Sequence, residues 1–68
     1  RQLKKDLSRV EKQISKSKEK IQLLEAEQES ESQNHARLIE ITSELESVRI
    51  ELQSREEEWL EITLQLDS

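Results

Sequence analysis

Apolar residues recur along this chain in two separate heptad stripes. The first stripe is spaced alternately by four and three residues, with Ser17 at its one polar step: Leu3, Leu7, Val10, Ile14, Ile21 and Leu24. The second has the same spacing, with Arg55 at its polar step: Leu38, Ile41, Leu45, Val48, Leu52, Trp59, Ile62 and Leu66. This period is typical of coiled-coil helices, in which positions a and d form one apolar seam.

The two stripes are out of phase, and this predicts a turn between them. Continuing the first register would place polar residues in the core: Gln28, Glu31, His35 and Thr42. One uninterrupted helix would therefore rotate its stripe away from any partner. We expect a single domain over residues 1–68, with a helix over about 1–28, a turn over about 29–33 and a second helix over about 34–67.

The start of the second helix has two candidate caps. Ser30 with Gln33 fits the spacing of a capping box, in which a serine side chain and a glutamine side chain satisfy each other's backbone N–H groups. Asn34 is the alternative N-cap, because a short polar side chain can accept a hydrogen bond from the first turn.

Folding the chain so that Leu24 faces Leu38 aligns seven layers, ending with Leu3 against Trp59. This alignment predicts three complementary flanking pairs and one clash: Lys4 with Glu56, Glu11 with Arg49, Lys20 with Glu44, and Asp6 against Glu58. Such exposed pairs contribute only about 0.2–1 kcal/mol each, so they select an orientation more than they stabilise it. Ile62 and Leu66 have no partner in this alignment.

A parallel dimer of one long helix is the competing architecture. It would place Asp6 near Glu11 and Glu51 near Glu56 across the interface, and it would leave the phase break unexplained. We therefore predict an all-α fold, a two-helix antiparallel coiled-coil hairpin within one chain.

Composition agrees with long helices. The 68 residues include no Gly and no Pro, 40% are charged and 31% are hydrophobic, which favours a coiled coil over a compact core. Disorder is the alternative for so polar a chain, and the sustained heptads favour helices instead. The chain lacks Cys and any apolar run of the ~20 residues needed to span a bilayer. It opens in mid-pattern without Met, so we expect a fragment of a longer protein whose first helix begins further upstream.

Charge is divided between the two halves. Residues 1–20 hold eight of the eleven basic residues against three acids, a net of +5, whereas residues 21–68 hold three against thirteen, a net of −10. A basic helix followed by an acidic helix favours folding back. The outer side of the first helix would remain basic.

The basic residues on that outer side are the candidate binding site. Lys5, Arg9, Lys12 and Lys16 recur at intervals of four, three and four, facing away from the seam, where we expect the second helix not to neutralise them. Cations aligned along a helix can follow a phosphate backbone with salt-dependent, sequence-independent affinity. Arg1, Lys4 and Lys18 would assist. The alternative is an ordinary solvated face of a Lys-rich coiled coil.

No catalytic constellation is present in the sequence, and we expect neither enzyme activity nor a cofactor or metal site in this chain. His35 is the one histidine and is interpreted as a solvated residue near a helix start. The acids at 56–58 point in different directions around a helix. Trp59 is expected to pack on Leu3 at the open end. Leu60 and Leu64 lie off the seam and would contact another domain or a second copy.

The segments "LSRVEKQISKSKEKIQLLEAE" and "LIEITSELESVRIELQSREEEWLEI" resemble the C-terminal coiled-coil domain of the ABC-F ATPases, the Uup-like branch in particular. Two groups of residues carry this resemblance over nearly the whole chain: Glu11, Ile14, Ile21, Leu24 and Glu25 in the first segment, and Glu58, Trp59, Leu60 and Glu61 in the second.

The resemblance implies a cytoplasmic bacterial parent with two upstream ATP-binding cassettes that use ATP and Mg, and no membrane domain. It also implies contact with DNA or ribosomal RNA. The expected function is thus a nucleic-acid-binding C-terminal appendage of an ABC-F ATPase. The alternative is a structural or protein-interaction coiled coil that spaces, regulates or oligomerises its parent.

Overall fold

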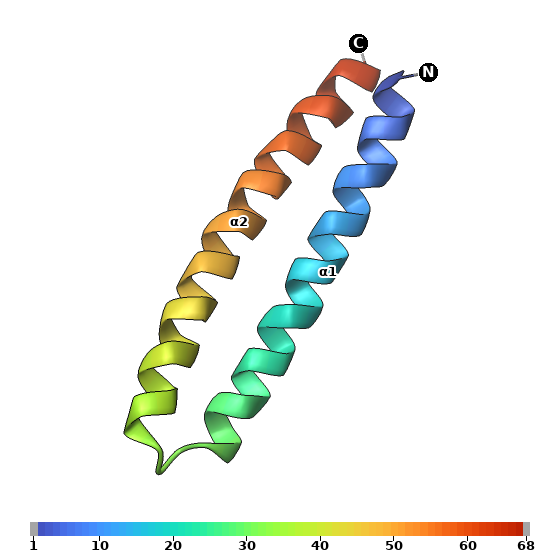
Figure 1. Cartoon of the computed structure of the whole chain (residues 1–68). Coiled ribbons are helices and arrows are strands. Elements are labelled where there is room, and N and C mark those ends of the chain that lie inside the picture. Colours follow the sequence, from blue (N-terminus) through green and yellow to red (C-terminus); the bar gives the residue numbers. More distant parts are fainter. Residues whose placement is uncertain (1, 68) are drawn as a thin grey trace.

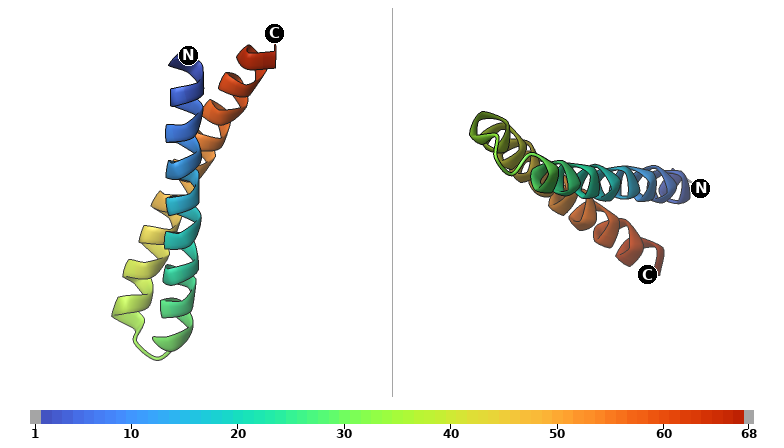
Figure 2. Two further views of the ribbon diagram at one scale, coloured as in Figure 1. Left: turned by 90° about the vertical axis from the view of Figure 1, so that its right-hand side faces the viewer. Right: turned by 90° about the horizontal axis from the view of Figure 1, so that it is seen from below.

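The computed structural model describes residues 2–67, and these residues form two antiparallel helices. Helix α1 covers Gln2–Ser30 and helix α2 covers His35–Asp67, so the first turn of α1 and the last turn of α2 lie at the same end of the hairpin (Figure 1). The helix axes cross at an angle rather than running strictly parallel (Figure 2). The predicted all-α antiparallel hairpin is confirmed.

The turn between the helices is short and needs no glycine. Glu31 N–H donates to Glu27 C=O at 2.8 Å and Asn34 N–H donates to Glu31 C=O at 2.9 Å, while no described residue has a positive φ. These two bonds satisfy backbone groups at the end of α1 that have no partner within the helix. A chain without Gly can therefore still reverse its direction within residues 31–34.

Asn34 is the N-cap of α2. Its Oδ1 accepts a hydrogen bond from the N–H of Arg37 at 3.2 Å, and its C=O accepts from the N–H of Leu38 at 2.9 Å. Ser30 belongs to α1, where its hydroxyl donates to Glu27 C=O at 3.1 Å. Of the two candidate caps, the structure uses Asn34 and not the capping box.

The predicted seam is the interface between the helices. Every seam residue from Leu3 to Leu24 on α1, and from Leu38 to Ile62 on α2, is buried or half-buried, including the polar Ser17 and Arg55. Leu66 is the exception, at 38% exposed. The heptad pattern therefore located the buried face of each helix correctly.

The main apolar cluster lies in the half of the hairpin nearer the turn. Leu24 of α1 packs with Ile41, Leu45 and Val48 of α2, and the partly buried Ile21 packs against them. Ile41 is 0% exposed and fills the centre of this cluster. Burial of such side chains from water is the main term that holds two amphipathic helices together.

The predicted register between the helices is wrong by about two helical turns, one heptad. Trp59 Nε1 donates to Glu11 Oε2 at 3.3 Å, which places Trp59 well away from its expected partner Leu3. Arg37 of α2 likewise reaches Glu27 of α1, only three residues before the end of α1. Helix α1 ends two residues later than expected, at Ser30, and α2 begins one residue later, at His35. The chain therefore reverses further along its length, and residues of α2 face later residues of α1.

This shift also accounts for Ile62, which had no partner in the expected alignment. It moves each residue of α2 toward the end of α1, so Ile62, whose expected partner lay before residue 1, comes to lie beside the first turns of α1. Ile62 is only 8% exposed as a result. Leu66 lies one further turn along α2 and stays partly exposed.

None of the three predicted flanking ion pairs forms among residues 2–67. Arg49 pairs with Glu25 at 3.2 Å instead of Glu11, and Glu44 pairs with Arg37 at 3.7 Å instead of Lys20. The register shift is the physical reason, because it slides the flanking positions past one another.

Neither of the two described helices is long and apolar enough to cross a membrane.

Candidate nucleic-acid interface

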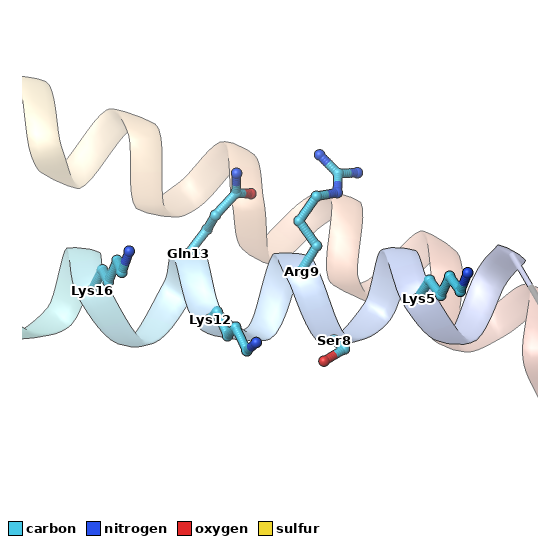
Figure 3. A pocket seen from close by; sticks show the side chains of 6 residues that line it. All are labelled: Lys5, Ser8, Arg9, Lys12, Gln13 and Lys16. Atoms are coloured by element: carbon cyan, nitrogen blue, oxygen red, sulfur yellow. The ribbon is translucent and has the colours of Figure 1, made fainter.

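The four predicted binding residues line one shallow depression on α1. Ser8 and Gln13 complete its lining, and its volume is about 400 Å³. Figure 3 shows that Lys12 and Ser8 point away from α2, whereas Arg9 and Gln13 extend toward it. The structure thus brings Lys5, Arg9, Lys12 and Lys16 together on one surface of α1. Their side chains do not all point the same way, because Arg9 extends toward α2 and Lys12 points away from it.

Lys5, Lys12 and Lys16 are exposed and form no ion pair in the described part of the chain. A wider contrast sets them apart: all four described arginines are ion-paired, and none of the six lysines is. A guanidinium offers a planar fork of five donors that suits carboxylates, whereas an ammonium is a strongly hydrated point charge. The lysine charges of α1 therefore remain available in water.

Arg9 differs from the expectation. Its Nη2 lies 3.6 Å from Glu58 Oε2 of α2 and 3.8 Å from Asp6 Oδ1 of its own helix. The prediction that the second helix cannot neutralise this side is therefore wrong for Arg9. The physical reason is position, since Arg9 lies at the flank of the seam, where a long side chain can reach across. Its side chain is still 55% exposed.

The Arg9 contact also resolves the expected clash between Asp6 and Glu58. Both carboxylates approach the same guanidinium, and Glu58 also accepts a hydrogen bond from Arg55 Nη1 at 3.4 Å. Two cations thus surround the acid that was expected to be repelled. These contacts are long and partly solvated, so each is weak.

Of the remaining arginines, Arg37 and Arg49 pair with acids of α1, whereas Arg55 pairs with Glu58 of its own helix. Arg37 Nε donates to Glu27 Oε2 at 2.7 Å across the helices, and its Nη1 donates to Glu40 Oε2 at 3.0 Å. These hydrogen bonds to Glu27 and Glu40, in that order, raise the pKa of Arg37. This cluster lies beside the turn, and it ties the end of α1 to the start of α2.

The expected assisting residues do not join the depression. Lys18 lines a different hollow with Trp59 and Glu56, on the other flank of the hairpin. Lys4 is exposed and lies outside both hollows. Arg1 lies outside the described residues.

Trp59 is half-buried between the helices. Besides its hydrogen bond to Glu11, it lines a hollow of about 450 Å³ with Ile14 and Leu60. It therefore does not pack over Leu3 at the open end, as the sequence alignment suggested. Because its ring is engaged with α1, it is not presented to a nucleic-acid base.

Ser8 and Gln13 belong to the depression but were not among the predicted residues. Both lie within one turn of Lys12 on α1, and helical spacing of three and four residues is the signal that could have found them. Gln13 Oε1 is buried and accepts no hydrogen bond among the described residues.

No group of three or more His, Asp or Glu side chains within 2–67 is arranged to hold a metal ion. His35 is exposed and lines a shallow hollow with Leu38, Ile39 and Thr42.

No protein-family model matches this chain, and the curated proteins and solved structures contain no match to it either.

Proposed function

We propose that the hairpin is a nucleic-acid-binding module that contacts phosphates through Lys5, Lys12 and Lys16. The observation that carries the proposal is that these three exposed ammonium groups share one surface of α1 and have no carboxylate partner among residues 2–67. Arg9 joins them only when it leaves Glu58 and Asp6.

The spacing of the lysines suits a phosphate backbone. At a rise of about 1.5 Å per residue, Lys12 and Lys16 lie roughly 6 Å apart along α1, and Lys5 lies roughly 10 Å before Lys12. Each strand of duplex DNA carries one phosphate charge for about every 3.4 Å of helix axis, so ammonium groups spaced by roughly 6 and 10 Å can each meet a separate phosphate. Ser8, on the same surface, can donate to a phosphate oxygen as well.

Binding through this surface reads charge and not sequence. The depression offers no Asn, no free Arg and no aromatic ring for base edges, apart from Gln13, which extends toward α2 (Figure 3). The net charge of −5 opposes approach of a polyanion, but its effect is screened beyond about 8–10 Å at ordinary salt. Affinity should therefore be modest and strongly salt-dependent.

We further propose, from the resemblance to the ABC-F coiled-coil domain, that the hairpin is a C-terminal appendage of a cytoplasmic bacterial ATPase. In such a parent, the ATP and Mg sites would lie in the upstream cassettes. The hairpin would be the part of that protein that binds DNA or ribosomal RNA.

The test is a titration of the 68-residue chain with duplex DNA, branched DNA and a ribosomal RNA fragment at several salt concentrations. We expect dissociation constants in the range of about 10⁻⁴–10⁻⁶ M near physiological salt, typical of non-specific binding. Reversing three charges in K5E/K12E/K16E should abolish it, whereas the matched reversal K4E/K18E/K20E should weaken it much less. Absence of binding at low salt, or equal loss in both variants, contradicts the proposal.

A further inference from the structure

Helix α2 exposes large apolar side chains on the side that faces away from the seam. The exposed fractions are 72% for Ile39, 63% for Ile50, 53% for Leu60 and 62% for Leu64. Such a helix is apolar on two opposite sides, whereas a helix at the surface of a two-helix hairpin needs only one apolar side. The hairpin leaves the second side of α2 without a partner.

These residues follow a coiled-coil pattern of their own. From Ile39 to Leu64 the positions alternate by four and three residues, and the steps between the apolar ones are polar: Ser43, Glu46, Gln53 and Glu57. We call these eight positions the outer stripe of α2. This spacing is the one by which a coiled-coil helix packs against a partner helix.

We propose that the outer stripe of α2 docks a basic amphipathic helix of another protein. Charge complementarity argues for that partner. Glu46 and Glu57 lie within the stripe and Glu61 lies beside it, and all three are exposed without an ion pair in the described structure. The partner helix must present apolar side chains opposite Ile50, Leu60 and Leu64, and Lys or Arg opposite the acids.

A hollow next to the outer stripe offers a site for a side chain of the docked helix. Leu60 belongs to the outer stripe and also lines the hollow that Ile14 and Trp59 form between the two helices. A large side chain of a docked helix could enter there and bury apolar surface on both α1 and α2. Buried apolar anchors of this kind carry most of the energy of helix-in-groove recognition.

A second copy of this chain fits the stripe less well. Two outer stripes packed together would bring Glu46, Glu57 and Glu61 of both copies into one interface. The alternative is to pack the basic outer side of α1 onto the stripe of the next copy. This contact does not close, because the two surfaces lie on opposite sides of the hairpin, and it would generate an open array.

The experiment uses two synthetic four-heptad peptides, both with Leu at positions a and d. One carries Lys at positions e and g, and the other carries Glu there. Binding to the 68-residue chain is measured by titration calorimetry. The test variant is I50Q/L64Q, which removes two exposed apolar groups while keeping good helix formers. The matched control is L23Q, because Leu23 is 71% exposed on α1 and outside the stripe.

We expect the Lys peptide to bind the wild-type chain and the L23Q variant equally, and to bind I50Q/L64Q at least tenfold more weakly. The Glu peptide should not bind. Equal affinity of the Lys peptide for all three proteins, or no binding at all, overturns the proposal. Sedimentation of the wild-type chain alone supplies one further outcome: a dimer that I50Q/L64Q abolishes would assign the stripe to a second copy and also overturn it.

Discussion

Arg9 of α1 lies 3.6 Å from Glu58 of α2, and this contact divides the basic surface of the first helix. Glu58 and Asp6 hold Arg9 toward the seam, while Lys5, Lys12 and Lys16 keep their charges free. The basic surface available to a polyanion therefore consists of three lysines. Arg9 can join them only after its contacts with Glu58 and Asp6 are broken.

Glu58→Gln should release Arg9 and increase nucleic-acid affinity. The neutral amide loses its charge attraction for Arg9, so one more cation can meet a phosphate. We expect affinity for duplex DNA to rise about two- to fivefold, with the salt dependence steeper by about 0.9 in the slope of log K against log salt. Fluorescence anisotropy at several salt concentrations measures both.

Glu57→Gln is the matched control for that change, because it removes the same charge from an exposed neighbour that holds no arginine. Its affinity should rise only slightly and its salt slope should stay unchanged. Equal effects of the two variants would mean that net charge alone acts, and that Arg9 is not held back by Glu58.

The Trp59 ring should show which register the hairpin adopts in solution. Trp59 and Ile14 line the same hollow, and the indole N–H bonds Glu11. We expect NMR cross-peaks from the indole protons to the methyl groups of Ile14 and none to those of Leu3. Cross-peaks to Leu3 alone would support the alignment expected from the sequence and contradict the structure.

The sequence predicted the buried face of each helix correctly, but it did not predict the register between the helices. Heptad spacing identified the buried side of each helix, because residues at positions a and d must meet a partner wherever they lie along it. The register was missed because a shift by one heptad, two helical turns, again places seam residues opposite seam residues. The position of the turn decides between such alignments, and a segment without Gly or Pro gave no sign that α1 would continue to Ser30.

The sequence predicted the lysines of the candidate site but missed the ion pair of Arg9, and the register error is again the cause. Lys5, Lys12 and Lys16 follow directly from helical spacing. The pairing of Arg9 depends on the register, so an incorrect register concealed it. One signal was nevertheless present: the expected clash of Asp6 with Glu58 marked a place where a nearby cation would be stabilised.

Ile41→Ala should destabilise the hairpin strongly, because Ile41 is 0% exposed at the centre of the apolar cluster. Removal of a buried isoleucine side chain typically costs about 2–5 kcal/mol. For a hairpin this small, we expect most of the helical circular dichroism signal to be lost at room temperature.

Ile39→Ala is the control for this core substitution, since Ile39 lies one turn or less away and is 72% exposed. It should change the free energy of unfolding by less than about 0.5 kcal/mol. Similar thermal unfolding curves for the two variants would contradict the observed assignment of buried and exposed faces on α2.

Asn34→Ala should lower the stability of α2 by removing its N-cap. The lost hydrogen bond to the N–H of Arg37 corresponds to about 0.5–2 kcal/mol. At about 4–8 °C per kcal/mol for a domain of this size, the melting temperature should fall by several degrees. Gln33→Ala, one residue earlier in the turn, should leave the melting temperature nearly unchanged, and a reversed order would assign the cap elsewhere.

The most direct test of the nucleic-acid proposal is the salt dependence of duplex DNA binding in two triple variants that lose the same charge. In K5Q/K12Q/K16Q the slope of log K against log salt should fall in magnitude by about 0.9 for each lost phosphate contact, and affinity should fall with it. In K4Q/K18Q/K20Q, whose substitutions lie outside the depression, the slope should stay close to that of the wild-type chain. Equal slopes in both variants would contradict the account.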